Sequence, residues 1–225
     1  MADDAPAPIT LIERRPKLTL ALAVGLALAA SWWFQGQPPP ARKLELTPVV
    51  EAVLKDDGGP SLGPRDAEVI VVVFTDYQCP VCKRTDAALG RLVANDHRVR
   101  VIYKDWPILG EASVLAAQVA LAADRQGRYA AVHQRMMASP AKLDSARIKD
   151  IAIAAGVDWP RLEADRVAHR AAIESRLAGN ADQAWSLGLQ GTPGYLVGPL
   201  LMKGGLDDRD LEQAVAAARK AGPPR

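Results

Sequence analysis

The chain has 225 residues, of which 49% are hydrophobic and 24% charged, ordinary values for a globular protein of one sizeable domain with extra segments. Its 28 basic and 26 acidic residues give a net charge of +2, so the charge balance gives no case for nucleic acid as a partner. The three histidines, His97, His133 and His169, are scattered, which indicates surface or partly buried helix residues rather than metal ligands.

The chain begins with a polar tail, residues 1–17, and an uncharged apolar run, residues 18–34 (LTLALAVGLALAASWWF). As a helix this run would be roughly 25 Å long, slightly short of a bilayer core. The aromatic residues 32–34 favour a retained transmembrane anchor, because aromatic rings prefer the membrane interface. The small-x-small pattern Ala27-Leu28-Ala29 is instead typical of the cleavage site of a signal peptide. Both interpretations direct the chain to a membrane.

The flanking charges predict an orientation. Three basic residues (Arg14, Arg15 and Lys17) precede the run and two follow it, a weak bias that favours an inside N-terminus. We therefore expect an inner-membrane anchor with the domain facing the periplasm or the cell exterior, or a secreted form if the segment is cleaved. Disulfides persist in those compartments.

Residues 35–64 are predicted to be a linker and lead-in. The proline-rich part, about 35–45, is typical of a semi-rigid spacer. Residues 47–55 fit either a short helix or a strand, and DDGGPSLGP (56–64) is a loop by composition.

A strand–helix–strand unit follows. Residues 68–74 (EVIVVVF) are dominated by a β-branched apolar run, which predicts a central buried strand. Helical spacing of apolar residues then continues to Asn95 or Asp96. Residues 98–103 alternate in polarity and predict a second strand.

The next region, residues 110–187, is helical in pattern, with segments at 111–126, at 128–138, at 145–155 behind a cap at Asp144, and from about 159. A hairpin over 191–205 and a helix over 208–220 complete the chain. The sequence therefore predicts an α/β domain with an inserted helical subdomain.

Both cysteines lie in Cys79-Pro80-Val81-Cys82, at the first strand-to-helix junction. The N–H groups and dipole of a helix N-terminus favour a thiolate at Cys79, and Pro80 suits the first helical turn. Cys82 lies one turn further, directed toward the core. This asymmetry suits a redox couple, in which an exposed Cys79 attacks or is attacked and a shielded Cys82 resolves the mixed disulfide.

Two other uses of the cysteines fit less well. Structural zinc needs four ligands, and the chain has neither a second cysteine pair nor a nearby histidine pair, so we expect no metal site. A structural disulfide over two intervening residues would constrain the unfolded chain very little. A redox couple explains the motif best and requires no metal or organic cofactor.

The stretch FTDYQCPVC (74–82), followed far downstream by QGTPGYLVG (190–198), resembles the DsbA-like family of the thioredoxin superfamily. The resemblance extends over about 65–220. It implies a thioredoxin-like fold with a helical insertion at about 108–188.

The resemblance also implies roles for particular residues. Cys79 would be the nucleophile and Cys82 the resolving thiol of a redox-active Cys79–Cys82 disulfide. Pro193 matches the family's cis-proline, which would expose the backbone of Thr192 to pair with substrate; an ordinary tight turn is the alternative. Asp76 either helps proton transfer near Cys79 or hydrogen-bonds the local backbone as a turn residue.

The residues around the motif admit two interpretations each. Pro80 and Val81 are auxiliary candidates. Tyr77 and Gln78 either line a substrate groove or shape the loop. Lys83 and Arg84 either favour the thiolate electrostatically or are simply solvated. The Pro-Val dipeptide lacks the histidine of the most oxidising members, and Val73 stands where thioredoxin has a buried acid, so the direction of exchange stays open.

The sequence thus predicts a membrane-tethered, extracytoplasmic thiol:disulfide oxidoreductase that acts on protein or peptide thiols and uses a membrane redox partner. One alternative is a reductase or isomerase that runs the reverse exchange. The other is a chaperone-like peptide-binding module in which the CxxC motif is not catalytic.

Overall fold

The computed structural model describes residues 16–35, 40–56 and 58–222. The chain divides into two units, Met1–Pro38 and Pro39–Arg225. The first contains the helix α2 (Pro16–Gln35), where the sequence predicts an apolar membrane segment. Among the described residues, no helix combines the length and the apolarity that crossing a membrane requires. Most of the predicted tail and residues 36–39 of the predicted linker lie outside the described residues.

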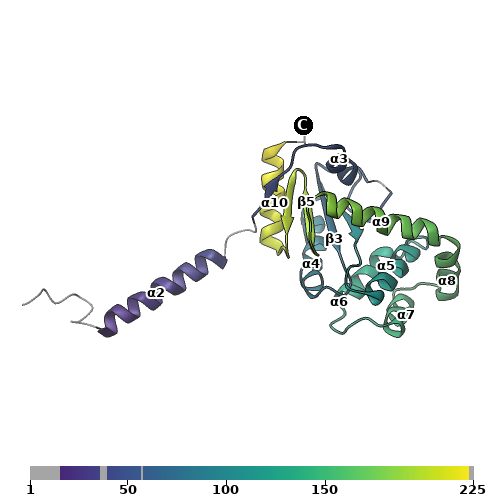
Figure 1. Cartoon of the computed structure of the whole chain (residues 1–225), viewed down its shortest axis with the longest axis horizontal. Helices are drawn as coiled ribbons and strands as arrows, with labels where there is room; N and C mark the ends of the chain where they lie inside the picture. The colour runs from purple at the N-terminus through teal and green to yellow at the C-terminus, as the bar shows by residue number, and fades with distance from the viewer. Residues whose placement is uncertain (1–15, 36–39, 57, 223–225) are drawn as a thin grey trace, which may run out of the picture. The chain divides into compact units, whose positions relative to one another are not determined.

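The second unit is built on a six-stranded sheet with the order β1-β6-β5-β3-β4-β2 (Figure 1). Among the described strands, β3 and β4 pair in parallel, and the other neighbouring pairs are antiparallel. The strands are β1 (Arg42–Lys43), β2 (Ser61–Leu62), β3 (Val69–Thr75), β4 (Val99–Asp105), β5 (Gly194–Val197) and β6 (Leu200–Lys203).

The strand–helix–strand prediction is confirmed. Strand β3 is buried except at Ile70, and the helix α4 (Pro80–Asn95) makes the crossover that its parallel pairing with β4 requires. Strand β4 runs two residues beyond the predicted end, which places Lys104 and Asp105 in the sheet.

Part of the predicted linker and loop belongs to the sheet. Strand β1 pairs with β6 and strand β2 pairs with β4, so each covers an edge that would otherwise expose unpaired backbone groups. Residues 47–55, which by sequence fit either a helix or a strand, contain the helix α3 (Pro48–Leu54). The helix forms because Thr47 caps it and Pro48 occupies its first turn.

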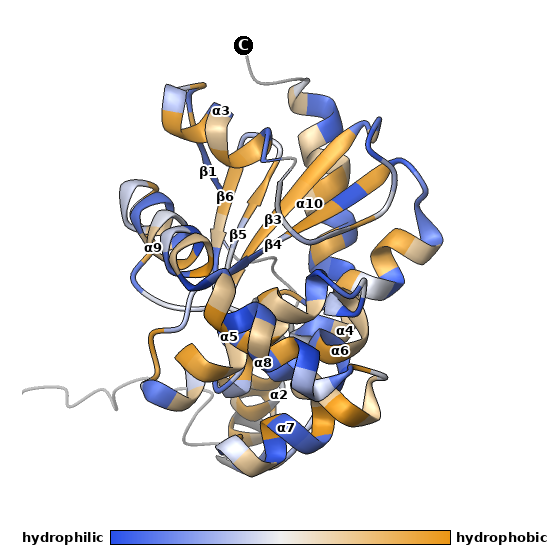
Figure 2. Cartoon of the chain, turned by 90° about the vertical axis from the view of Figure 1, so that its right-hand side faces the viewer, coloured by the Kyte–Doolittle hydropathy of each residue, from blue (hydrophilic) through white to orange (hydrophobic). Residues whose placement is uncertain are grey.

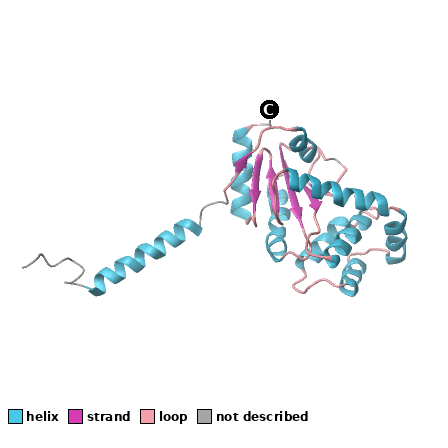
Figure 3. Ribbon diagram, in the orientation of Figure 1, coloured by secondary structure: helices cyan, strands magenta, loops and turns pink. Residues whose placement is uncertain are grey.

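Five helices form the insertion between β4 and β5, and one more ends the chain (Figure 3). The inserted helices are α5 (Glu111–Asp124), α6 (Tyr129–Ala138), α7 (Ser145–Ala154), α8 (Trp159–Ala168) and α9 (Arg170–Ser186), and the last helix is α10 (Asp208–Ala221). Asp144 caps α7, as the sequence predicts. The inserted helical subdomain is therefore confirmed.

The two sides of the sheet bury separate apolar clusters, and the strand β3 is correspondingly hydrophobic (Figure 2). On one side, which we call the α4 face, Val71 and Val73 pack with residues of α4, α10 and the insertion. On the other, the α3 face, Val72 and Phe74 pack with residues of α3 and the end of α9. Alternation along a strand produces this division.

Candidate active site

The CPVC segment forms the turn between β3 and α4. Cys79 occupies the N-cap of α4 in an extended conformation, and Pro80 begins the helix. The amide of Cys79 donates to the carbonyl of Asp76 at 3.1 Å, and the amide of Lys83 donates to the carbonyl of Cys79 at 3.1 Å. The first cysteine therefore lies at a helix N-terminus, as the sequence predicts.

The two sulfurs have opposite acidities. Hydrogen bonds from the Cys82 thiol, from the backbone amides of Cys82 and Val81 and from the Thr192 side chain lower the pKa of Cys79 to about 5, although burial opposes this shift. Burial, followed by the hydrogen bond to Cys79, raises the pKa of Cys82 far above its usual value. The Cys79 thiol is thus the more acidic of the two, and the Cys82 thiol is the less acidic.

Both cysteines are free thiols in this structure, so the disulfide between them stays a prediction. Cys79 is less accessible than the sequence indicates: it is 6% exposed, and Cys82 is 2% exposed. The sulfur of Cys79 lies 3.3 Å from the carbonyl oxygen of Thr192, 113 positions away, which covers it.

The Thr192–Pro193 peptide bond is cis, as the resemblance implies. Strand β5 begins at the next residue, and the amide of Gly204 donates to the carbonyl of Pro193 at 3.0 Å. The loop that precedes β5 is thereby held beside Cys79.

Asp76 is a buried turn residue with four hydrogen bonds. Its carboxylate accepts from the amide of Gln78 at 2.7 Å and from the hydroxyl of Ser113 at 2.7 Å. It also accepts from the amides of Ile108 and Leu109 at 2.8 and 3.0 Å. The four partners of this carboxylate are three backbone amides and the Ser113 hydroxyl, which favours the turn interpretation over proton transfer.

Gln78 and Lys83 attach the active-site turn to the loop between α6 and α7. The Gln78 amide group exchanges two hydrogen bonds with the backbone of Leu143, at 2.5 and 3.1 Å. The Lys83 ammonium donates to the carbonyls of Ser139 and Ala141 at 3.0 Å each. Gln78 therefore shapes the loop, and Lys83 is a loop anchor rather than a merely solvated charge.

The sequence predicts a surface or partly buried residue at His133 and gives no sign of its place beside the active-site turn. This side chain is 2% exposed and hydrogen-bonds Tyr77 in the active-site turn and Asp86 on α4. Its spacing of four from Tyr129 and from Met137, on one face of a helix, is the signal that could have placed it in the core.

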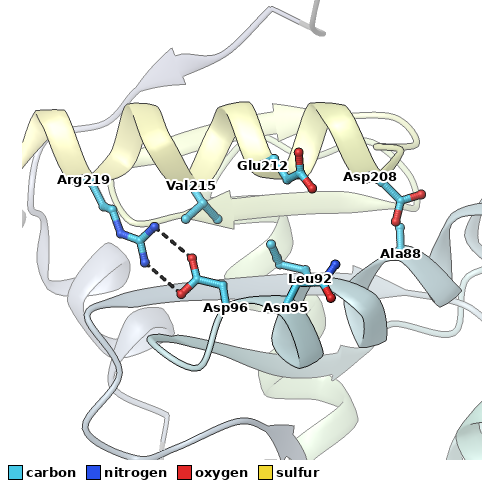
Figure 4. Close-up of a pocket in the computed structure, with 8 residues that line it drawn as sticks. All are labelled: Ala88, Leu92, Asn95, Asp96, Asp208, Glu212, Val215 and Arg219. Atoms are coloured by element: carbon cyan, nitrogen blue, oxygen red, sulfur yellow. Dashed lines mark hydrogen bonds and ion pairs between the residues drawn. The ribbon is translucent and has the colours of Figure 1, made fainter.

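A separate pocket of about 280 Å³ lies between α4 and α10 and contains neither cysteine. Figure 4 shows its lining, in which Arg219 pairs with Asp96 at 2.9 Å. Among the described residues, no three His, Cys, Asp or Glu side chains lie together as metal ligands would.

A thioredoxin-like sheet, a CPVC turn at a helix N-terminus and a cis-proline loop over the first cysteine define the class of protein as thioredoxin-like. The sequence model of the DSBA-like thioredoxin domain matches residues 70–216. The chain belongs to this family.

Solved structures agree with this assignment. A thioredoxin-like oxidoreductase from Silicibacter pomeroyi is 38% identical with a TM-score of 0.72, and the match covers 76% of this chain and 98% of that one. The catalytic domain of Proteus mirabilis ScsC is 32% identical with a TM-score of 0.67, over 75% and 93% of the two chains. The thiol-disulfide exchange protein alpha-DsbA2 from Wolbachia pipientis is 28% identical with a TM-score of 0.71, over 74% and 90%.

Curated relatives are longer proteins. The Na(+)/H(+) antiporter NhaA 1 of Salinispora arenicola is 27% identical over 189 residues, which is 80% of this chain and 29% of that protein. The NhaA 3 antiporter of Salinispora tropica is 28% identical over 158 residues, 69% of this chain and 24% of that protein. The chain thus spans less than a third of the length of these relatives.

Proposed function

We propose that this chain is a thiol:disulfide oxidoreductase that acts on protein or peptide thiols through Cys79 and Cys82. The observation that carries the proposal is the pair of opposed acidities at one helix N-terminus: hydrogen bonds led by the Cys82 thiol lower the pKa of Cys79 to about 5, while burial raises that of Cys82. A thiolate is both the better attacking group and the better leaving group, so a pair of this kind exchanges at Cys79.

The exchange has two steps in the oxidising direction. A substrate thiolate attacks the Cys79 sulfur of the disulfide; the new substrate–Cys79 bond forms, the old S–S bond breaks, and Cys82 leaves as a thiolate that takes up a proton. A second substrate thiolate then attacks the substrate sulfur and expels the Cys79 thiolate. The products are a substrate disulfide and the dithiol enzyme, and Thr192 offers backbone groups to hold the substrate segment.

The low pKa of Cys79 favours this direction. A stabilised thiolate stabilises the reduced enzyme, which makes its disulfide a stronger oxidant. Disulfide reduction or isomerisation is the reverse use of the same couple and is the second candidate.

The first experiment titrates the full chain, in detergent, with glutathione redox buffers. An equilibrium midpoint between about −120 and −180 mV supports oxidation or isomerisation, and one near about −270 mV supports reduction. Cys79→Ser should abolish exchange, and Cys82→Ser should accumulate the mixed disulfide. If Cys79→Ser keeps full activity in a peptide-holding assay and the wild-type couple does not exchange, the chaperone-like alternative replaces the proposal.

Residues 18–34, in this proposal, direct the chain to the inner membrane and place the redox domain on the periplasmic or exterior side, where a membrane redox partner reoxidises it. The uncharged composition of this run supports the assignment, as do the exposed apolar side chains along α2, among them Leu20 and Leu26. Cell fractionation with intact-mass measurement tests it. A full-length membrane form indicates an anchor, a shortened exported form indicates a signal peptide, and a full-length cytosolic form refutes the assignment.

A further inference from the structure

One imidazole in the helical insertion connects the two ends of the CPVC segment. The Nδ1 atom of His133 lies 2.9 Å from the Tyr77 hydroxyl, and its Nε2 atom lies 2.8 Å from Oδ1 of Asp86. Tyr77 precedes Cys79 by two residues, and Asp86 follows Cys82 by four. His133 therefore holds the turn before the first cysteine and the helix after the second.

The imidazole is enclosed by aromatic rings. Its centroid lies 4.3 Å from that of Tyr103 and 5.5 Å from that of Tyr129, with which it stacks at 20°. The Tyr77 ring meets it edge-on at 5.4 Å. Rings on β4, on α6 and in the turn leave the imidazole one orientation, so the two hydrogen bonds fix the turn relative to α4.

Further polar groups extend this cluster. The Tyr129 hydroxyl donates to the Asp105 carboxylate at 3.1 and 3.3 Å and lies 3.4 Å from the Tyr77 hydroxyl. Asp105 is 1% exposed. The charged or titratable groups near His133 are thus Asp86 on α4, Asp105 and Tyr103 on β4, Tyr129 on its own helix and Tyr77 in the turn.

Removing the imidazole would destabilise the Cys79 thiolate in two ways. The turn and the helix would lose their common support, and with it the alignment of the Val81 and Cys82 amides that stabilise the thiolate. The buried carboxylate of Asp86, one helical turn from Cys82, would also lose its imidazole partner. A nearby negative charge disfavours a thiolate.

We propose that His133 is a positioning residue for thiol–disulfide exchange, which acts through Tyr77 and Asp86 to hold the CPVC turn against the N-terminus of α4. This inference rests on the proposed function. It assigns the helical insertion a part in the chemistry of the sulfurs.

The test compares His133→Phe with the wild type as the reduced full chain in detergent. Thiolate absorbance near 240 nm is followed against pH, and the rate of reaction with glutathione disulfide is measured at pH 5 and pH 8. We expect the thiolate midpoint to rise by about one pH unit. At pH 5 the rate should then fall about fivefold, with little change at pH 8.

Val132→Ala is the matched control. Val132 is fully buried on the same helix, and its truncation removes packing without touching either hydrogen bond. Urea unfolding should show lost stability for both His133→Phe and Val132→Ala, but of these two only His133→Phe should shift the thiolate midpoint.

Two further variants refine the test. Tyr77→Phe should raise the midpoint by less than His133→Phe does. His133→Gln, which retains an amide donor for Asp86, should bring the midpoint part of the way back to the wild-type value.

Equal midpoints for His133→Phe and Val132→Ala would overturn the inference and leave His133 a packing residue. If His133→Phe does not fold, Tyr77→Phe provides the test, since it deletes only the hydroxyl that faces His133. An unchanged thiolate midpoint in Tyr77→Phe would also overturn the inference. Absence of exchange in the wild type would instead refute the proposed function, so the two failures are distinguishable.

Discussion

Two consecutive residues of β4 show how differently the two faces of the sheet hold a buried charge. Lys104 lies on the α3 face, 1% exposed, and its ammonium pairs with Asp56, which Arg176 also contacts at 3.4 Å. Asp105 lies on the α4 face, 1% exposed, and its carboxylate accepts hydrogen bonds from the Tyr129 hydroxyl.

The partners explain the difference. On the α3 face a cation meets an anion, and the pair attaches the lead-in segment to the sheet. On the α4 face the carboxylate is held by tyrosine hydroxyls, and burial raises the pKa of Asp105 to about 6, against the lowering effects of His133, Tyr77 and Tyr129. The comparison teaches that the α3 face uses charge for attachment, while the α4 face keeps titratable groups in a cluster continuous with the active-site turn.

The largest expected effect is on the α3 face. Asp56→Ala should reduce the free energy of unfolding by about 3 kcal/mol, because it leaves a buried ammonium facing only Arg176. Urea denaturation measures the loss, and Lys104→Met in the same background should recover much of it. The thiolate midpoint of Cys79 should not move; a shift would show that the two faces are coupled.

The same pair predicts a pH dependence. Burial raises the pKa of Asp56, but the hydrogen bond and charge of Lys104 outweigh it and lower that pKa below its usual value. A lowered folded pKa contributes stability that is present above the unfolded pKa and is lost as the pH falls below about 4. Unfolding curves from pH 5 to pH 2 should show this loss in the wild type and a smaller one in Asp56→Ala.

Asp105 should give the opposite response. Because burial raises its pKa to about 6 from 3.8, the folded state keeps a proton that the unfolded state has released. Stability should therefore fall as the pH rises from about 4 to about 6, by up to about 3 kcal/mol. Asp105→Asn should flatten that part of the profile, measured by urea unfolding; an unchanged slope would mean that another group titrates there.

Steric crowding on the α4 face should reach the active site. A Cβ at Gly205 would lie 2.8 Å from side-chain carbons of Val81 and Thr85, whereas one at Gly90, on the same helix α4, would meet nothing within 4 Å. Gly205→Ala should cost about 1–3 kcal/mol of stability and raise the thiolate midpoint by displacing Val81. Gly90→Ala should stabilise by about 0.5–1 kcal/mol and leave the midpoint unchanged. Equal midpoints in the two variants would contradict this.

The smallest effects concern one helix cap on each face. Thr47 caps α3, and Asp207 caps α10 in a capping box with Asp210. Thr47→Ala and Asp207→Ala should each reduce the free energy of unfolding by about 1 kcal/mol. Neither should change exchange with glutathione, because neither cap contacts the active-site turn; a changed rate would extend the site to that cap.

Sequence alone determined the features whose causes are local. β-branched runs predicted β3 and β4, helical periodicity predicted the insertion, and the position of Cys79 between a strand and a proline placed it at a helix N-terminus. The motif FTDYQCPVC, followed by QGTPGYLVG after a helical block, was enough to identify the DsbA-like family. These signals are read within a few turns of chain or by motif.

Tertiary structure decided what depends on distant partners. Burial of Lys104 and Asp105 became evident only when β4 was placed between two helical layers. His133 gained its place from Tyr77, 56 positions away, and Cys79 gained its cover from Thr192, 113 positions away. A pattern of residue types fixes which side chains are apolar, but the partner of a buried polar group is chosen by packing, since only the folded chain brings such groups within hydrogen-bonding distance.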